Sequence, residues 1–371
     1  MSPDGTWNRA RRVLAVRLDA MGDVLMTTPA LRALKGPGRS VTLLTSPSGA
    51  AAARLVPEVD EVIVYEAPWL KATPPRPDSR HEAAMIGRLR EGRFDAAVIL
   101  TVFSQNPLPS ALLCWSAEIP LRLAHCRENP YQLLTDWIPE PETDRPQRHE
   151  VRRQLDLVAA VGARPEDERL SMSVPDAARR AVTGHLLSVG IDPDRPWIPI
   201  HPGASAPSRR YPPEGFAEAA RLLASEHGYQ VVFTGSEAER GLIEGIREAM
   251  GTPSASLAGR LDLGGLAALI ERAPAIVSNN TGPIHVAAAV GTPVVVLYAL
   301  TNMQHTPWAV PSRVLNHDVP CAPCYKSVCP EGHHHCLRKV APGAVVGAVL
   351  DLIGESAARR SSSTVPAPSW G

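Results

Sequence analysis

The sequence lacks a surplus of charge of either sign. Its 371 residues include 38 Lys and Arg and 38 Asp and Glu, so the formal net charge at pH 7 is +0. A protein that attracts nucleic acid through its overall field needs a basic surplus. We therefore expect no nucleic-acid partner, and any anionic ligand has to be held by a local site.

The sequence also lacks a long apolar run. No stretch of about 18 apolar residues, the length that spans a bilayer, occurs anywhere. Three arginines between residues 9 and 12 precede an apolar stretch, as in a signal peptide, but Arg17, Asp19 and Asp23 interrupt it. We expect a cytoplasmic protein with at most peripheral contact with the inner face of the membrane.

Cysteine is scarce, because six cysteines in a chain of this length are too few for a disulfide scaffold. Four of them fall within residues 321–336, namely Cys321, Cys324, Cys329 and Cys336. Thiolates at such spacings suit tetrahedral zinc or iron, so a structural metal is the favoured interpretation. A reduced loop without metal and a Cys-x-x-Cys redox pair remain alternatives.

Absent as well is a G-x-G-x-x-G motif after the first strand-like run, which counts against a nicotinamide or flavin enzyme. The chain instead shows apolar runs that alternate with helical patterns. These runs cover residues 13–18, 41–45, 61–65 and 96–100 in the first half, and 197–200, 230–234, 275–278 and 294–298 in the second. Uninterrupted apolar strands between helices indicate parallel sheets covered on both faces.

The length fits two domains, because single cores stop growing at roughly 250 residues. We expect an α/β protein with two Rossmann-like, doubly wound parallel-sheet domains, residues 1–170 and 171–355, the second containing the cysteine-rich segment. They are expected to face a central cleft that binds ligand at the carboxyl ends of the strands. Residues 356–371 lack periodicity and are expected to form a disordered tail.

The first candidate site residue is Asp23, which follows Gly22 where a helical pattern begins. Gly22 permits close backbone approach or a positive φ. Asp23 is expected to cap the helix or to act as general base on an acceptor hydroxyl, and the two roles are compatible. Asp19, one turn of chain earlier, is a rival for the base, or else a loop carboxylate that faces solvent.

A second group lies in the loop after residues 197–200, which carries Ser205 and the adjacent Arg209 and Arg210. Small residues leave backbone N–H groups available, and two guanidinium groups supply forked donors for a diphosphate. Without a metal, such cations stabilise the charge that develops on a diphosphate leaving group. The alternative is a surface loop with two solvated arginines.

A third group precedes a helical pattern, with Thr281 at the cap position and Pro283 in the first turn. The N–H groups around Thr281 and Gly282 are expected to face a phosphate, although an ordinary capped helix has the same pattern. His285, one turn into the helix, is either close to the ligand or a packed histidine.

Two acidic residues, Glu237 and Glu239, follow the strand-like run 230–234. In nucleotide-binding folds a carboxylate at this place binds a ribose diol. Acids in the first turn of a helix also have a structural reason of their own, because they complement the helix dipole.

Three segments together resemble the signature segments of glycosyltransferase family 9, the ADP-heptose:lipopolysaccharide heptosyltransferases. They are M-G-D-V-L-M-T-T-P-A-L at residues 21–31, H-P-G-A at 201–204 with R-R-Y-P at 209–212, and S-N-N-T-G-P-I-H-V-A-A-A-V-G-T-P-V-V-V-L-Y at 278–298. The resemblance implies the GT-B fold, with an acceptor-binding N-terminal domain and a nucleotide-sugar-binding C-terminal domain. It also implies an inverting transfer that requires no cofactor.

Carried over by position, the resemblance makes Asp23 the base and Arg209 the diphosphate contact. Thr281 and Gly282 match the phosphate-binding turn, and Glu237 or Glu239 matches the ribose contact. The implied partners are a nucleotide-diphosphate sugar, with ADP-heptose favoured, and a glycan, lipid-linked or small-molecule acceptor.

One departure concerns the donor, because Asn280 stands where the heptosyltransferases usually carry Asp. The neutral amide leaves the identity of the donor sugar open. Two other functions fit the same fold. A sugar-nucleotide epimerase would convert the donor without an acceptor, and a non-catalytic nucleotide-sugar-binding protein would bind the donor without transferring or hydrolysing it.

Overall fold

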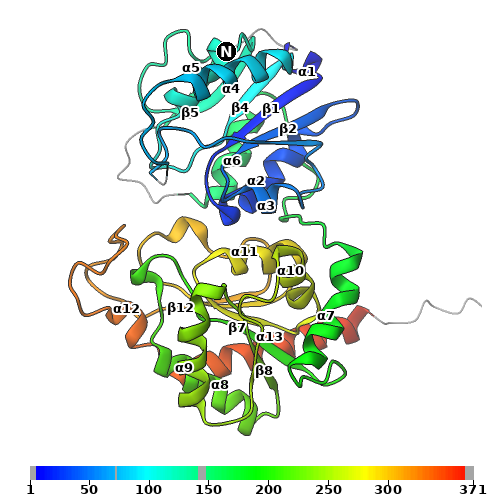
Figure 1. Cartoon of the computed structure of the whole chain (residues 1–371), viewed down its shortest axis with the longest axis vertical. Coiled ribbons are helices and arrows are strands. Elements are labelled where there is room, and N and C mark those ends of the chain that lie inside the picture. Colours follow the sequence, from blue (N-terminus) through cyan, green and yellow to red (C-terminus); the bar gives the residue numbers. More distant parts are fainter. Residues whose placement is uncertain (1–5, 72, 141–147, 364–371) are drawn as a thin grey trace, which may run out of the picture. The chain divides into compact units, whose positions relative to one another are not determined.

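A computed structural model of the chain describes residues 6–71, 73–140 and 148–363 (Figure 1). The chain forms two compact units, Met1–Ser173 and Val174–Gly371. The boundary follows Ser173, close to the expected end of the first domain at residue 170. Each unit is built on its own parallel six-stranded sheet, so the expected α/β, doubly wound class is confirmed.

The first sheet has the strand order β3-β2-β1-β4-β5-β6, and all its pairs are parallel. Its strands are β1 (Arg12–Arg17), β2 (Ser40–Thr45), β3 (Glu61–Val64), β4 (Ala96–Ile99), β5 (Leu121–Cys126) and β6 (Asp136–Pro139). Its helices are α1 (Thr6–Arg9), α2 (Met21–Leu34), α3 (Ala50–Ala53), α4 (Arg80–Glu91), α5 (Leu108–Ser116) and α6 (Glu150–Ala159).

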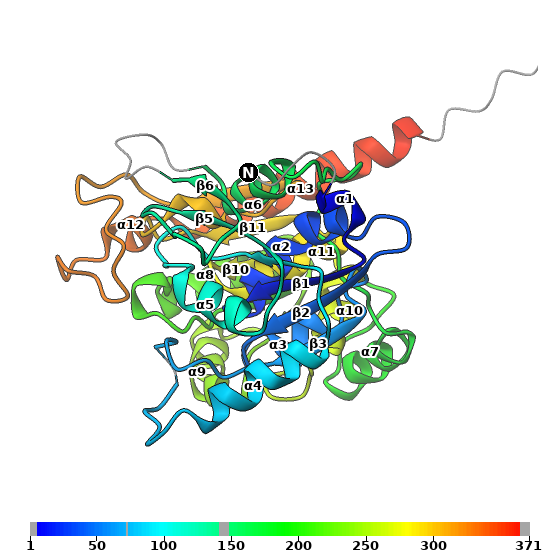
Figure 2. The ribbon, with the colours of Figure 1, turned by 90° about the horizontal axis from the view of Figure 1, so that it is seen from above.

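The central strand β1 explains why this sheet is covered on both faces. Residues 13–16 of β1 are apolar and almost fully buried, so both faces of the strand lie in a core. Leu14 and Val16 pack with Met85 of α4 and Leu113 of α5. Figure 1 shows α2, α3 and α6 on the opposite face of the sheet, and Figure 2 looks onto α4 and α5.

The second sheet has the order β12-β11-β10-β7-β8-β9 and is also parallel throughout. Its strands are β7 (Trp197–His201), β8 (Gln230–Phe233), β9 (Ala255–Ser256), β10 (Ile276–Asn279), β11 (Val294–Leu297) and β12 (Ser312–Leu315). Its α-helices are α7 (Asp176–Ser188), α8 (Pro213–Ser225), α9 (Arg240–Met250), α10 (Leu263–Arg272), α11 (Gly282–Val290), α12 (His335–Arg338) and α13 (Pro342–Ser363), and its 3-10 turns are η1 (Pro207–Arg209), η2 (Glu237–Glu239) and η3 (Met303–His305).

The two sheets share one winding order. Counted within its own unit, each runs 3-2-1-4-5-6, so the direction of winding reverses between β1 and β4 in the first sheet and between β7 and β10 in the second. Doubly wound sheets bind ligands at this reversal, beyond the carboxyl ends of the strands. The segments that follow β1, β4, β7 and β10 are therefore where functional side chains are expected.

The last helix, α13, packs its Val345, Val349 and Leu352 into the core of the second unit with Phe216 of α8 and Ile246 of α9. It runs through Ser363, so the tail expected from residue 356 begins as helix. Residues 364–371 of that predicted tail lie outside the described residues. Among the described helices, none combines the length and apolar character needed to cross a bilayer.

Candidate active site

The first candidate site is built around Arg17, the last residue of β1, whose side chain is fully buried. Its Nη2 lies 3.2 Å from Asp23 Oδ1, its Nε lies 3.1 Å from Asp19 Oδ2, and its Nη1 lies 3.1 Å from Glu150 Oε1. Nη1 also donates to the carbonyl of Leu100, which follows β4, at 2.9 Å. One guanidinium thus fixes three carboxylates at the reversal point of the first sheet.

Asp23 lies in the first turn of α2 and performs the capping role predicted from the sequence. Its Oδ2 accepts a hydrogen bond from the backbone N–H of Ala20 at 3.2 Å, while Oδ1 faces Arg17. The side chain is nevertheless 20% exposed, so a substrate hydroxyl can reach it. The positive-φ interpretation of Gly22 is wrong, because Gly22 is helical and lies within the first turn of α2.

The pKa values of both candidate bases are raised, first of all by burial. Burial is the largest cause of the raised pKa of Asp23; Arg17 opposes it and the charge of Glu150 adds to it. Burial also raises the pKa of Asp19, which Arg17 lowers in turn and Asp23 raises. A carboxylate whose pKa lies above the ordinary range is a stronger proton acceptor, as general base catalysis requires.

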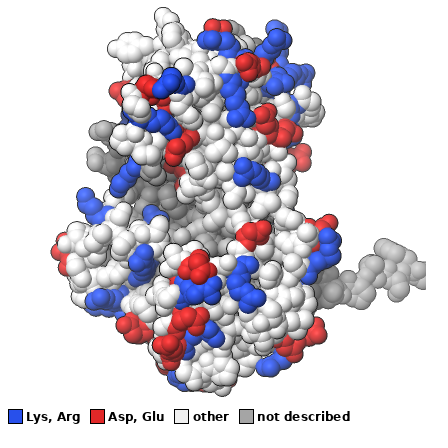
Figure 3. All heavy atoms as spheres, in the orientation of Figure 1, with Lys and Arg blue, Asp and Glu red and all other residues white. Residues whose placement is uncertain are grey.

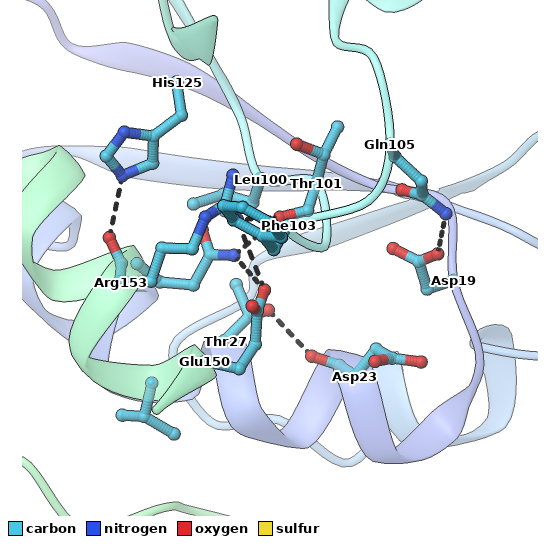
Figure 4. A network of polar contacts seen from close by, with 12 residues as sticks. Asp19, Asp23, Thr27, Leu100, Thr101, Phe103, Gln105, His125, Glu150 and Arg153 are labelled. Carbon is cyan, nitrogen blue, oxygen red and sulfur yellow. Dashed lines mark hydrogen bonds and ion pairs between the residues drawn. The ribbon is translucent and has the colours of Figure 1, made fainter. Parts of the chain in front are cut away.

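The rival base, Asp19, is more fully engaged than Asp23. Its Oδ1 accepts a hydrogen bond from Gln105 Nε2 at 2.6 Å, and its side chain is 12% exposed. Figure 4 shows Gln105 bonded to Asp19 at one edge of this network. The structure therefore brings both predicted carboxylates together and leaves Asp23 the more accessible.

A second buried pair supports the same cluster. Arg153 of α6 binds Glu140 through Nε at 2.6 Å and Nη2 at 2.7 Å, and its Nη1 lies 3.5 Å from Glu150. His125, at the end of β5, bonds through Nε2 to the Arg153 carbonyl at 3.0 Å (Figure 4). Burial lowers the pKa of His125, so this imidazole is neutral at pH 7 and its Nε2–H donates to the carbonyl.

Two cavities open beside these groups at the carboxyl edge of the first sheet. One, of about 400 Å³, is lined by Gln105, Asn106, Pro107, His125, Arg127, Glu128 and Glu140. The other, of about 180 Å³, includes Asp19, Trp69 and Gln105 in its lining. A third cavity, of about 530 Å³ in the second unit, adjoins Arg195, before β7, and Gln230, at the start of β8, and its lining contains no predicted site residue.

The second candidate site lies in the other unit, in the loop after β7. Ser205 and Arg210 are exposed, and Arg210 Nε donates to the Ala204 carbonyl at 2.8 Å. Arg209 ends the turn η1 and is partly buried. Neither Arg209 nor Arg210 forms an ion pair with a carboxylate in the described part of the chain, so both charges remain available for an anion.

Arg209 and Asn280 both affect the ionisation of Tyr298, which directly follows β11. Burial raises the pKa of Tyr298 to about 12, while a backbone hydrogen bond from His305, the charge of Arg209 and a hydrogen bond from Asn280 act in the opposite direction. Asn280 is only 4% exposed. Tyr298, which sequence reasoning did not select, thus joins two of the predicted residues.

Helix α11 begins where the sequence placed it. Thr281 occupies the N-cap position in an extended conformation but makes no capping hydrogen bond with its side chain, and Gly282 and Pro283 form the first turn. A helix that starts in this way can present N–H groups that have no partner within the helix to an anion. His285 is 4% exposed and lies among the buried residues of α11, which favours its interpretation as a packed histidine.

The two acidic candidates for the ribose differ clearly. Glu239 accepts hydrogen bonds from Ser236 N at 2.7 Å and Ser236 Oγ at 2.9 Å, and its carboxylate lies so close to Gly203 that an added Cβ there would meet Oε1 at 1.9 Å. Glu237 is exposed and pairs with Arg240 at 2.5 Å. The carboxylate of Glu239 therefore lies between the loop after β7 and the loop after β8. The carboxylate of Glu237, in contrast, is already paired with Arg240.

The four clustered cysteines are free thiols and partly buried. The pKa of Cys336 is raised, first by burial, with Cys329, Cys324 and Cys321 adding to the effect and a backbone hydrogen bond from Leu300 opposing it. The thiols thus lie close enough to influence one another. Within the described residues, however, no three His, Cys, Asp or Glu side chains converge closely enough to hold a metal ion.

Comparison with known proteins identifies the family. Residues 83–335 match the model of "Glycosyltransferase family 9 (heptosyltransferase)", which is more than half of the chain. The chain belongs to glycosyltransferase family 9. It is 28% identical over 361 residues to lipopolysaccharide heptosyltransferase 2 of Salmonella typhimurium, an alignment that covers 93% of this chain and 99% of that protein.

Solved structures of the family agree with the fold. The chain matches the E. coli ADP-heptose lipopolysaccharide heptosyltransferase II with a TM-score of 0.72 and 25% identity, over 93% of this chain and 99% of that one. A family 9 glycosyltransferase from Veillonella parvula superposes with a TM-score of 0.76 at 24% identity, over 96% and 99% of the two chains. The predicted GT-B architecture is confirmed, and the protein is a glycosyltransferase, which disfavours the epimerase and the non-catalytic binding protein.

Several residues of the two candidate sites escaped the sequence prediction. Arg17 was seen only as an interruption of an apolar stretch, although a charged residue at the end of a buried strand is itself a signal of a polar site. Asn279, the last residue of β10, is fully buried and joins this strand to the segment between β7 and α8, since its Nδ2 donates to the Pro202 carbonyl at 2.7 Å and its Oδ1 accepts from Tyr211 N at 3.0 Å. Glu150 lies too far along the sequence from Arg17 for any local pattern to join them.

Proposed function

We propose that this enzyme transfers heptose from ADP-heptose to a hydroxyl of a glycan or lipopolysaccharide acceptor, with inversion at the anomeric carbon. The similar E. coli structure is described as an ADP-heptose lipopolysaccharide heptosyltransferase. The observation that carries the proposal is the contrast in charge. Carboxylates cluster around Arg17 in one unit, whereas the guanidinium groups of Arg209 and Arg210 have no carboxylate partner in the described residues of the other.

In the proposed reaction Asp23 removes the proton from the acceptor hydroxyl as that oxygen attacks the anomeric carbon. The bond to the diphosphate breaks on the opposite side of the sugar ring, so a single displacement inverts the configuration. Arg209 and the N–H groups at the start of α11 stabilise the negative charge on the departing diphosphate. The positive charge of Arg209 and these N–H dipoles perform the role that a metal ion performs in other transferases, and no metal is required for the proposed chemistry.

We propose further that residues 174–363 bind the donor, with the ribose diol on Glu239. The carboxylate of Glu239 lies against Gly203, in the loops that also carry Arg209. Glu239 also faces the buried His201, whose pKa falls to about 4 because burial disfavours its charged form. A neutral imidazole leaves the negative charge of Glu239 available to accept hydrogen bonds from two hydroxyl groups.

The acceptor is proposed to bind the first unit. The cavity of about 400 Å³ lies at the same sheet edge as Asp23, and Gln105 in its lining bonds directly to Asp19. Its lining is polar and mixes Arg127 with Glu128 and Glu140, which suits a hydroxyl-rich sugar. Because nucleotide sugars are cytosolic metabolites, we place the reaction in the cytoplasm, with at most peripheral contact at the inner face of the membrane.

The donor is tested by titrating ADP-heptose, GDP-sugars and UDP-sugars into the wild-type protein and the Asn280→Asp variant. If ADP-heptose is the donor, it binds most tightly of the panel, and Asn280→Asp changes its affinity by no more than about tenfold. An amide and a carboxylate both accept hydrogen bonds from a sugar hydroxyl. Tight binding of a UDP- or GDP-sugar without binding of ADP-heptose contradicts the heptosyltransferase proposal while leaving a glycosyltransferase.

We also propose that the four clustered cysteines hold one structural zinc or iron. Their thiolates form a donor set that suits tetrahedral coordination by either metal, and all four lie within residues 321–336. The four side chains do not converge among the described residues, so binding requires these side chains to move together. Elemental analysis of protein purified without a metal-affinity tag is expected to find about one metal per chain, and its complete absence refutes this proposal.

A further inference from the structure

Ser208, the residue before Arg209, forms three hydrogen bonds with the cysteine segment, which we define as residues 321–336. Its backbone N–H donates to the Ser327 carbonyl at 3.0 Å, and its hydroxyl donates to the Lys326 carbonyl at 2.7 Å. Its own carbonyl lies 2.6 Å from His334 Nε2. A carbonyl only accepts, so His334 is the donor in this last bond.

The cysteine segment is itself anchored to the sheet of its own unit. Cys324 N and Tyr325 N donate to the carbonyls of Leu300 and Thr301, in the loop after β11, at 3.2 and 3.0 Å. At its other end, the carbonyl of Cys336 accepts from His317 N, beyond β12, at 2.9 Å, and Cys336 packs against the apolar core of the unit. The segment therefore joins the loop after β11 to the turn that carries Arg209.

Ser208 connects the anchored cysteine segment to Arg209. Ser208 is 3% exposed and lies inside η1, while Arg209, the next residue, is partly buried, and its charge lowers the pKa of Tyr298. Tyr298 precedes Leu300 and Thr301, to which the cysteine segment is bonded. The segment thus contacts both the residue before Arg209 and the loop that follows Tyr298.

We propose that the cysteine segment positions Arg209 for the donor diphosphate, with Ser208 and His334 as the positioning residues. The proposal rests on the role given to Arg209 above. A guanidinium gains most from a diphosphate when its fork is already aligned, because less side-chain freedom is then lost on binding. In this proposal the cysteine segment supports the donor site. A substitution that disturbs the segment therefore weakens donor binding more than it slows proton transfer.

The test is a double-mutant cycle in the full-length protein, with ADP as the probe in isothermal titration. Ser208→Ala removes one neutral hydrogen bond and is expected to weaken ADP binding about fivefold, and Arg209→Ala is expected to weaken it about tenfold or more. If Ser208 acts through Arg209, then Ser208→Ala changes ADP affinity by less than about twofold once Arg209 is alanine.

One control variant and one pair of variants at His334 separate a positioning role from a general loss of structure. Ser225→Ala removes a hydroxyl that bonds to the Arg221 carbonyl at 2.6 Å on α8, and it serves as the matched control with unchanged ADP affinity. His334→Gln retains an N–H donor and is expected to keep most of the affinity that His334→Ala loses. Melting temperatures of all variants show whether each one folds.

The outcomes distinguish the two proposals. If Arg209→Ala leaves ADP affinity unchanged, the proposed donor role of Arg209 is wrong. If Arg209→Ala weakens binding while Ser208→Ala and His334→Ala do not, the donor role stands and the positioning role is overturned. Equal effects of Ser208→Ala in both backgrounds likewise overturn it, because Ser208 would then act without Arg209.

Discussion

The charged groups of the two candidate sites are satisfied in opposite ways. In the first unit Arg17 and Arg153 are buried and bonded to Asp19, Asp23, Glu150 and Glu140. In the second, Arg209 and Arg210 form no ion pair within the described residues. A site whose charges are satisfied internally is suited to move a proton, whereas a site with unpaired cations is suited to receive an anion.

The surface shows that this contrast is local. On the face drawn in Figure 3, basic and acidic side chains are interspersed, with no large area of one sign. The formal net charge of the chain is +0. Selectivity for an anionic donor therefore comes from the loop after β7 and the start of α11, and an overall field contributes little.

The largest expected effect is on turnover, from Asp23→Asn. Because a general base acts mainly in the transition state, we expect kcat to fall by about 10²–10⁴. The asparagine retains an oxygen that can accept from Ala20 N, so α2 keeps its cap. Steady-state kinetics with ADP-heptose and a heptose-deficient acceptor measure the change.

Asp19→Asn is the matched comparison for that variant, since Asp19 shares Arg17 but is bonded to Gln105. Its effect on kcat is expected to be clearly smaller than that of Asp23→Asn. The reverse order would make Asp19 the base.

The next largest effect is on stability, from Arg17→Met. This change leaves three carboxylates around a buried site without their shared cation, and breaking a buried pair in this way costs about 3–5 kcal/mol. Arg179→Met is the control, because the Arg179 side chain is 45% exposed in its pairs with Asp176 and Glu271. Exposed pairs contribute about 0–1 kcal/mol. Urea denaturation measures the free energy of unfolding of both variants. Equal losses would contradict the claim that the buried ion pairs of Arg17 contribute more to stability than the exposed pairs of Arg179.

A smaller effect concerns pH, from Glu150→Gln. Asp23 must be deprotonated to act, so kcat/KM falls as the pH drops through the pKa of Asp23. The charge of Glu150 raises that pKa, and Arg17, Asp19 and the Ala20 N–H are the other groups that face Asp23. Removing the charge lowers the pKa, and the acid limb of the profile shifts to lower pH. A shift to higher pH, or none, contradicts the coupling.

Sequence pattern predicted the strands that are both apolar and central. The runs at 13–18, 96–100, 197–200 and 275–278 correspond to β1, β4, β7 and β10, because strands buried on both faces are apolar throughout. It missed β5, whose buried residues include Arg122 and His125, and it missed the edge strands β6, β9 and β12, of which β6 and β12 are mostly partly exposed and mixed in character. Edge strands depend on a neighbour that is distant in sequence, and a local pattern does not contain that neighbour.

The candidate site divides in the same way. Asp23, Thr281 and Gly282 were predictable because each follows a central strand, where loops carry function. The partners that tune them were not, since Glu150 comes from α6 and the bonds to Ser208 come from residues 326–334. Such contacts exist only once the chain has folded.

The division of labour between the units is tested most directly by titrating ADP into three proteins, the wild type, Asp23→Asn and Arg209→Ala. Asp23→Asn is expected to bind ADP as tightly as the wild type, within about twofold, because the base makes no contact with the diphosphate. Arg209→Ala is expected to bind ADP about tenfold more weakly or worse, through loss of a charge-assisted contact. Loss of ADP binding in Asp23→Asn, or wild-type affinity in Arg209→Ala, would contradict the account.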